Sequence, residues 1–322
     1  MMLNQMYNVN GKFGGKFNEK TIQIILTATM VLGLGACSNS NGGSEEQTSL
    51  TIQFVPTNSD SVDATTAAFA EYMKNLLDMD VEVTVATDYT TIVEAMESGQ
   101  VDVGIMPPAA YVQARSLDAA TSILSSTLVD YDENEMPVEG TSVGTFKAEV
   151  ITRADADISS WKDLEGKNVA YLSVTSASGY VYPVAEMKEA GVDIDSVNFT
   201  AINDVVSAIK AVISGQVDAC FTFEGSRYVF NNVVTDDAGN PVDLFETTKA
   251  AILSEGDIPN DAIAVLPSMS DELKEKVKEA FLTMASDEEG LEIMSAWGHT
   301  GYVESDEAAY DTTAEYIEAA GE

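Results

Sequence analysis

The chain contains few of the residues on which disulfide frameworks and zinc sites depend. Its 322 residues include 2 cysteines and 1 histidine, too few for a disulfide scaffold or a metal site of the Cys/His type. Basic residues are also scarce, since 16 Lys and Arg stand against 53 Asp and Glu, a formal net charge of −37. This charge argues against nucleic acid or an anionic lipid surface as a binding partner. It suits a protein that stays soluble outside a cell, and we expect no cofactor.

The amino-terminal part lacks an apolar run of the ~20 residues that a transmembrane helix needs. Three lysines within residues 12–20 instead precede a short apolar stretch at residues 22–34 and a Leu-Gly-Ala-Cys sequence that ends at Cys37. A basic segment before a short apolar segment predicts a secretory signal peptide, residues 1–36. The four residues at its end resemble a lipobox, in which Cys37 is diacylated and becomes the N-terminus of the mature chain.

A polar segment rich in glycine and serine comes next, and it predicts a flexible tether at residues 37–48. This context favours a lipoprotein over an ordinary secreted protein whose cleavage site carries a cysteine by chance. The sequence therefore predicts an extracytoplasmic protein held at the outer face of the cell membrane by its lipid anchor alone. With Cys37 lipidated, Cys220 has no partner in the chain and is expected to be a small buried core residue.

Beyond the tether, segments with the periodicity of strands alternate with segments with the periodicity of helices. This alternation predicts an α/β fold with mostly parallel sheets flanked by helices. The predicted strands are 50–55, 81–86, 101–105, 167–172, 197–200, 217–223 and 263–266, and the predicted helices are 61–77, 89–96, 179–190, 204–213, 270–285, 287–296 and 307–319.

The same five residues, Ser-Gly-Gln-Val-Asp, occur at 98–102 and again at 214–218, each time between a predicted helix and a predicted strand. One copy in each of two similar halves would explain the recurrence. The alternative is a chance match, because junctions between a helix and a strand use few residue types. The chain is too long for one ordinary core. We expect one lobe from residues 49–146 with 255–322 and a second lobe from residues 147–254.

The strongest local signal for chemistry is a loop at residues 174–180, after a strand and before a helix. Thr175, Ser176 and Ser178 supply hydroxyl groups, Gly179 allows a close approach, and the helix start supplies free backbone N–H groups. Such a loop binds an anion without arginine, because the helix dipole is positive at this end. The alternative is that Ser178 only caps the helix.

Two further strand-to-helix turns carry hydroxyl groups. Tyr89 and Thr90 lie in the turn at residues 86–91, and Tyr111 ends the turn at 106–111. Sheets of α/β proteins bind ligands at the carboxyl ends of their strands, so both tyrosines are candidate ligand contacts. The alternative for each is a core aromatic ring with its hydroxyl at the rim.

These loops resemble those of one known family, the phosphate, phosphite and phosphonate substrate-binding proteins of ABC transporters. The matching segments appear in the family's order over nearly the whole mature chain. They are 85–90, 98–102 followed by 107–111, 175–180 with Pro183, 203–204 before 214–218, and 258–261.

The resemblance implies a two-lobed periplasmic-binding-protein fold of type II, with the ligand in the cleft between the lobes. It also implies ABC permease and ATPase subunits as partners, and we expect a monomer. By position, Thr175, Ser176 and Ser178 would hold an oxyanion from one lobe, and Tyr89 and Tyr111 from the other.

Three polar residues have roles implied by the resemblance alone. Asn203 stands where the family often has histidine, so it can donate a hydrogen bond but cannot become cationic. Glu224 and Asp261 fall where members that bind aminoalkyl phosphonates present carboxylates to the amine. Their alternative in so acidic a chain is that of solvated acids or turn residues.

The sequence thus predicts a binding protein that captures a phosphonate, phosphite or phosphate and delivers it to a permease. A related protein for sulfonate, nitrate or a pyrimidine precursor is one alternative. An enzyme on the same fold is a second, and it would need a nucleophile with a base or a metal cluster. An anchored sensor without a transporter is a third. The one histidine, His299, is expected to be a loop residue and not a catalyst.

Overall fold

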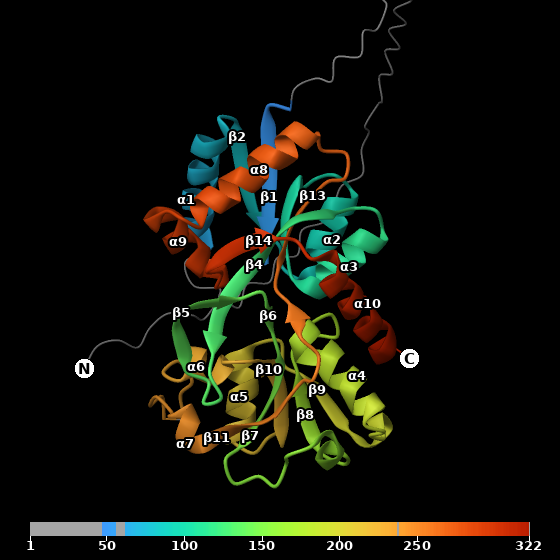
Figure 1. Ribbon diagram of the computed structural model, residues 1–322. Helices are drawn as coiled ribbons and strands as arrows, with labels where there is room; N and C mark the ends of the chain where they lie inside the picture. Colours follow the sequence, from blue (N-terminus) through green and yellow to red (C-terminus); the bar gives the residue numbers. More distant parts are fainter. Residues whose placement is uncertain (1–46, 56–61, 237, 322) are drawn as a thin grey trace, which may run out of the picture. The chain divides into compact units, whose positions relative to one another are not determined.

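Two β-sheets, each covered by helices, organise the chain (Figure 1). The computed structural model describes residues 47–55, 62–236 and 238–321. The predicted signal peptide, Cys37 and residues 38–46 of the predicted tether lie outside the described residues. Gln47–Glu322 forms one compact unit.

The first sheet has the strand order β14-β4-β13-β3-β1-β2, with β5 paired to β4. β1 runs parallel to β2 and β3, whereas the other pairs of this sheet are antiparallel. Its strands are β1 (Ser49–Phe54), β2 (Asp80–Val85), β3 (Val103–Met106), β4 (Thr121–Tyr131), β5 (Pro137–Val143), β13 (Ala262–Val265) and β14 (Gly301–Glu304).

The second sheet has the order β11-β7-β10-β8-β9. β8 runs parallel to β9 and β10, and β7 is antiparallel to β10 and β11. Its strands are β7 (Ala148–Arg153), β8 (Asn168–Tyr171), β9 (Asn198–Ala201), β10 (Ala219–Phe223) and β11 (Thr248–Leu253). A small antiparallel sheet pairs β6 (Thr145–Phe146) with β12 (Ile258–Pro259).

The α/β class is confirmed, but both sheets are mixed, which corrects the expectation of mostly parallel sheets. The antiparallel strands β4, β5, β7, β11 and β14 were not predicted. β5 is largely exposed along its whole length, so it shows none of the alternation of apolar and polar residues from which a strand is predicted.

Helices connect the parallel strands and cover the sheets. They are α1 (Val62–Leu77), α2 (Tyr89–Glu97), α3 (Pro108–Ser116), α4 (Tyr182–Glu189), α5 (Val205–Ile213), α6 (Ser226–Phe230), α7 (Leu244–Thr247), α8 (Asp271–Met284), α9 (Glu288–Met294) and α10 (Glu307–Gly321). A π-helix (Ala177–Val181) leads into α4, and 3₁₀ helices span Trp161–Leu164, Ile194–Ser196 and Ser295–Trp297. Among the described residues, no helix combines the length and the apolar character needed to cross a bilayer.

Capping side chains explain where several predicted helices begin. Asp88 accepts a hydrogen bond from the Thr91 amide at 2.8 Å at the start of α2, and Asp204 accepts one from the Ser207 amide at 2.7 Å at the start of α5. Ser270 caps α8 in the same way. The bond from the Thr91 amide is the main reason why the pKa of Asp88 lies below its ordinary value. Such caps satisfy amides that have no partner within the helix.

Apolar side chains fill both faces of each sheet. Ile52 belongs to a cluster with residues of α1, α8 and α9, and Met106 belongs to a cluster with residues of α2, α3 and α10. In the second sheet, Val150 packs in a cluster with residues of α4, whereas Ile151 packs in one with residues of α5. Cys220 is buried in that last cluster, as predicted.

The two Ser-Gly-Gln-Val-Asp segments form the same structure in the two sheets. Gly99 and Gly215 both have positive φ, at 67° and 74°, which glycine adopts without steric cost. In the first copy, an Asp102 carboxylate oxygen accepts from the Thr51 amide at 2.8 Å. In the second, an Asp218 oxygen accepts from the Asn168 amide, also at 2.8 Å. The recurrence therefore marks equivalent helix-to-strand junctions.

We expect Asp102→Ala and Asp218→Ala to lower the free energy of unfolding by similar amounts, about 1–2 kcal/mol each, because each leaves one strand amide without its acceptor. Urea denaturation of the two variants measures this. The exposed Asp195 offers a matched control, since its replacement by alanine should change stability by less than about 0.5 kcal/mol. A loss confined to one of the two junctions would contradict their equivalence.

An ion pair joins the turn between β4 and β5 to α6. The Arg227 Nε donates to both carboxylate oxygens of Glu135, at 2.9 and 3.1 Å, and its Nη2 also bonds to Glu135. Glu149 of β7 is fully buried, with an oxygen 3.9 Å from the Arg227 Nε. The end of β4 also packs tightly against the start of α6, because a Cβ on Gly225 would come within 2.5 Å of the Tyr131 ring.

Candidate functional site

Three predicted site segments meet at one edge of the second sheet. The Ser/Thr loop follows β8, Asn203 follows β9, and Glu224 follows β10. These strands are parallel neighbours, with β8 in the middle. Their carboxyl ends therefore lie at the same edge, which is where α/β sheets bind ligands.

The Ser/Thr loop is held in shape by its own hydroxyl groups. The Ser176 Oγ accepts a hydrogen bond from the Gly179 amide at 3.1 Å and so caps the π-helix. The Thr175 and Ser173 hydroxyls lie 2.9 Å apart. The cap is thus Ser176 and not Ser178, which corrects the alternative of a Ser178 cap. The buried Ser178 hydroxyl makes no hydrogen bond within the described residues.

Gly179 is required by the packing of this loop. A Cβ at this position would meet the Leu172 Cβ and the Ser176 Oγ, both at 2.8 Å. Glycine therefore lets the loop close against the end of β8. This brings the amides at the helix start beside the hydroxyls, and several of these amides have no acceptor within the helix.

Tyr89 and Asp261 lie at the matching edge of the first sheet and approach the Ser/Thr loop. Tyr89 begins α2 after β2, and Asp261 directly precedes β13. The Ser176 side chain lies close enough to Tyr89 to lower the pKa of the Tyr89 hydroxyl. Burial, and then the negative charge of Asp261, raise the pKa of Tyr89 to about 12. Tyr89, Ser176 and Asp261 therefore form one group, and the Tyr89 hydroxyl stays protonated at neutral pH.

His299 contacts this group, which the sequence analysis missed. Its Nε2 lies 3.3 Å from the Asp261 Oδ2, and its Nδ1 lies 3.4 Å from the Tyr302 hydroxyl. The residue does lie in a loop, as expected, but it is buried. The following strand β14 has only four residues, half of them exposed, so the sequence carried no signal that His299 is enclosed.

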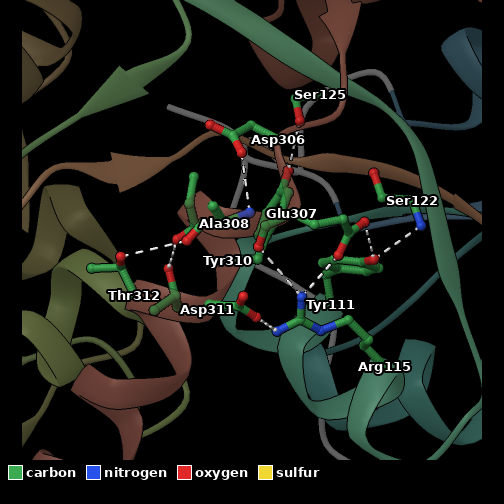
Figure 2. Close-up of polar contacts among 12 residues, drawn as sticks. Tyr111, Arg115, Ser122, Ser125, Asp306, Glu307, Ala308, Tyr310, Asp311 and Thr312 are labelled. Atoms are coloured by element: carbon green, nitrogen blue, oxygen red, sulfur yellow. Dashed lines mark hydrogen bonds and ion pairs between the residues drawn. The ribbon is translucent and has the colours of Figure 1, made fainter.

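The Tyr111 hydroxyl forms its hydrogen bonds away from the Ser/Thr loop. Figure 2 shows its hydroxyl pointing to Glu307 of α10, to whose Oε1 it donates at 2.7 Å. The same hydroxyl accepts from the Ser122 amide of β4 at 3.0 Å. Its ring is buried against that of Tyr310, with centroids 4.7 Å apart. Arg115 completes the cluster through an ion pair with Glu307. The geometry therefore gives Tyr111 the alternative role, a core aromatic ring that fixes α10 on α3.

The remaining predicted site residues, Glu224, Thr90 and Asn203, are partly or fully exposed. Glu224 is half-buried, and its Oε2 accepts from the Lys147 amide at 3.2 Å. Burial raises the pKa of Glu224 above its ordinary value. The side chains of Thr90 and Asn203 are exposed and form no hydrogen bond within the part of the chain that the structure describes.

Two helix-covered mixed sheets, with polar loops at the carboxyl ends of their parallel strands, agree with the type II periplasmic-binding-protein fold that the resemblance implies. Residues 52–310 match the family model described as ABC transporter, phosphonate, periplasmic substrate-binding protein. The chain therefore belongs to this family of phosphonate-transporter substrate-binding proteins.

Individual relatives agree with this assignment. The phosphate-import protein PhnD of Mycolicibacterium smegmatis is 27% identical over 287 residues, which cover 83% of this chain and 85% of the relative. A binding protein component of an ABC phosphonate transporter from Pseudomonas aeruginosa has the same fold, with a TM-score of 0.66, 17% identity, and coverage of 86% of this chain and 88% of that chain. PhnD1 from Prochlorococcus marinus, solved in complex with methylphosphonate, gives a TM-score of 0.62 at 15% identity, covering 84% and 97%. The first two of these relatives are proteins of transport systems.

Proposed function

We propose that the mature chain is attached by a lipid on Cys37 to the outer face of the cell membrane, where it captures a phosphonate, phosphite or phosphate. It passes this oxyanion to the permease of an ABC importer. The order of the amino-terminal segments supports the anchor: a basic segment, a short apolar stretch, a Leu-Gly-Ala-Cys sequence and a polar tether.

The single observation that carries the ligand proposal is the place of the Ser/Thr loop: it starts a helix at the carboxyl end of β8, with Ser176 close enough to Tyr89 to affect its pKa. An oxyanion at this point would accept from the hydroxyls of both residues and from the amides of the helix start. The Thr175 and Ser178 hydroxyls lie in the same loop and add two more donors. All of these donors are neutral, and they act at contact distance, whereas the surface carboxylates are screened beyond ~8 Å at physiological salt.

The ligand would then join two lobes. The strands of the second sheet all fall between Ala148 and Leu253, which supports a lobe at residues 147–254 and another formed by 49–146 with 255–322. A ligand that bonds to Tyr89 on one side and to Ser176 on the other stabilises the closed arrangement by its differential affinity for it.

A thermal-shift screen of the purified protein tests the proposed function. Phosphate, phosphite, methylphosphonate, 2-aminoethylphosphonate, sulfate, nitrate and taurine are compared at equal concentration. A ligand present at a hundred times its Kd stabilises the folded state by about 2.7 kcal/mol, which raises the Tm visibly. We expect the largest rise with a phosphorus oxyanion. A rise with sulfate, nitrate or taurine alone would replace the proposed ligand class by another solute.

Glu224 is proposed to favour ligands that carry an amine, because it follows β10 at the same edge of the second sheet as the Ser/Thr loop. Glu224→Gln is therefore expected to weaken binding of 2-aminoethylphosphonate by about tenfold while changing the affinity for methylphosphonate less than about twofold. Calorimetric titration with the two ligands measures both values. Equal losses for the two ligands would show that Glu224 does not recognise the amine.

A further inference from the structure

The only histidine of the chain is enclosed beside the candidate site. His299 is 4% exposed, and its ring packs edge-on against the rings of Trp297 and Tyr302, with centroid distances of 6.1 and 5.6 Å. Its Nε2 faces the Asp261 Oδ2 at 3.3 Å. A buried imidazole in this place either carries a proton and forms an ion pair with Asp261, or is neutral and leaves that carboxylate uncompensated.

Asp261 poses an electrostatic problem for any anionic ligand. It directly precedes β13, at the edge of the first sheet where β3 ends, and its charge acts on the hydroxyl of Tyr89, so it lies close to the donors that would bind an oxyanion. Two like charges this close repel strongly in a partly buried place. Among the described residues, no lysine or arginine forms an ion pair with Asp261, and His299 is the one basic side chain that lies against it.

The other titratable groups around this pair do not change charge near neutral pH. Tyr302 faces the imidazole, and Tyr89 and Tyr310 experience the charge of Asp261. Burial raises the pKa of each of these three tyrosines, to about 12 for Tyr89. Histidine is the side chain whose ordinary pKa lies in the neutral range.

We propose that His299 is a positioning residue for oxyanion capture: in its protonated form it holds and neutralises Asp261, so that an anion can bind between Tyr89 and the Ser/Thr loop. This inference rests on the proposed function and makes ligand affinity depend on pH. Protonation of His299 favours the bound state, and by thermodynamic reciprocity the bound anion favours protonation of His299.

The first test compares His299→Gln with the wild-type protein. Glutamine can still donate a hydrogen bond to Asp261 but carries no charge. The Kd for methylphosphonate is measured by calorimetry from about pH 6 to about pH 8.5, and the ratio of the two Kd values at each pH cancels the ionisation of the ligand itself. We expect the variant to bind about five- to tenfold more weakly at the acidic end and less than about twofold more weakly at the basic end.

Two further variants separate charge from shape. In an Asp261→Asn background, His299→Gln should change the Kd less than about twofold, since no carboxylate remains to be neutralised. Tyr302→Phe removes the hydrogen bond to the Nδ1 but keeps the ring, and it should leave the pH dependence of the wild type intact. A Tyr302→Phe profile equal to that of His299→Gln would overturn the proposal in favour of a purely structural role.

A measurement on the wild-type protein avoids the risk that a variant fails to fold. Because the chain has 1 histidine, its imidazole gives a single Cε1–Hε1 NMR signal in histidine-labelled protein. Methylphosphonate added at about pH 7 should move this signal towards its protonated position. Binding without such a movement, or a Kd ratio independent of pH, would overturn the role of His299 alone. A protein that binds no phosphorus oxyanion at any pH would overturn the proposed function, and this inference with it.

Discussion

Replacing Thr175 and Ser178 together by alanine is expected to weaken the binding of a phosphorus oxyanion by at least about a hundredfold. Each hydroxyl would donate one hydrogen bond to a charged ligand, and such bonds contribute about 1.5–3 kcal/mol each, where 1.4 kcal/mol corresponds to a factor of ten in Kd. The free energy of unfolding should change by less than about 1 kcal/mol. The Ser176 cap that shapes the loop remains, and Ser178 makes no hydrogen bond within the described residues. Calorimetric titration and urea denaturation measure the two effects.

The chain offers a matched control with the same pair of substitutions. Ser116 at the end of α3 and Thr283 in α8 are both exposed, and neither belongs to the loops at the carboxyl ends of the strands. Ser116→Ala with Thr283→Ala should leave the Kd within about twofold of the wild type. Unchanged affinity in the Thr175 and Ser178 double variant would remove the Ser/Thr loop from the ligand site.

Arg227→Ala is expected to lower the free energy of unfolding by about 3–5 kcal/mol, because it leaves buried carboxylates without their cation. The side chains of Glu135 and Glu149 are 7% and 0% exposed, respectively. Arg227 also donates to the Thr248 carbonyl at 3.1 Å and lies over the Phe245 ring. The comparison is Arg153→Ala, which removes an exposed pair with Asp155 and should cost less than about 1 kcal/mol.

The loss in Arg227→Ala should depend on pH in a defined direction. Burial, and then the charge of Glu135, raise the pKa of Glu149 well above its ordinary value. Since the folded state keeps this proton to higher pH than the unfolded state, stability falls as pH rises above the ordinary glutamate value of about 4.3. Arg227 opposes this fall, so the variant should lose more stability near about pH 7.5 than near about pH 5. A loss independent of pH would show that packing, and not charge, is what Arg227 contributes.

The elements that the sequence predicted well are those set by local chemistry. Asp88, Asp204 and Ser270 each cap a helix close to where the periodicity predicted its start. The recurrent pentapeptide likewise predicted two equivalent junctions, because its glycine allows the turn within a few residues of chain. The hydrogen bond of its aspartate is not local, since it reaches a strand 51 residues away in the first copy and 50 residues away in the second.

The features that sequence reasoning missed depend on contacts between distant segments. Tyr111 was a candidate ligand contact because of its place after a strand, but Glu307, 196 residues away, takes its hydroxyl. The partner of His299 is 38 residues away in another loop. Neither pairing leaves a local pattern, since it arises only when non-consecutive strands such as β4 and β14 come together in the sheet.

The most direct test of the account is a crystal structure of the protein grown with the phosphorus oxyanion that gives the largest thermal shift. Oxygen atoms of the ligand should lie within hydrogen-bond distance, about 2.5–3.2 Å, of the Tyr89, Thr175 and Ser178 hydroxyls and of the amides that start the π-helix. The Asp261 carboxylate should remain paired with His299. A ligand bound away from the Ser/Thr loop would contradict the site proposed for this protein.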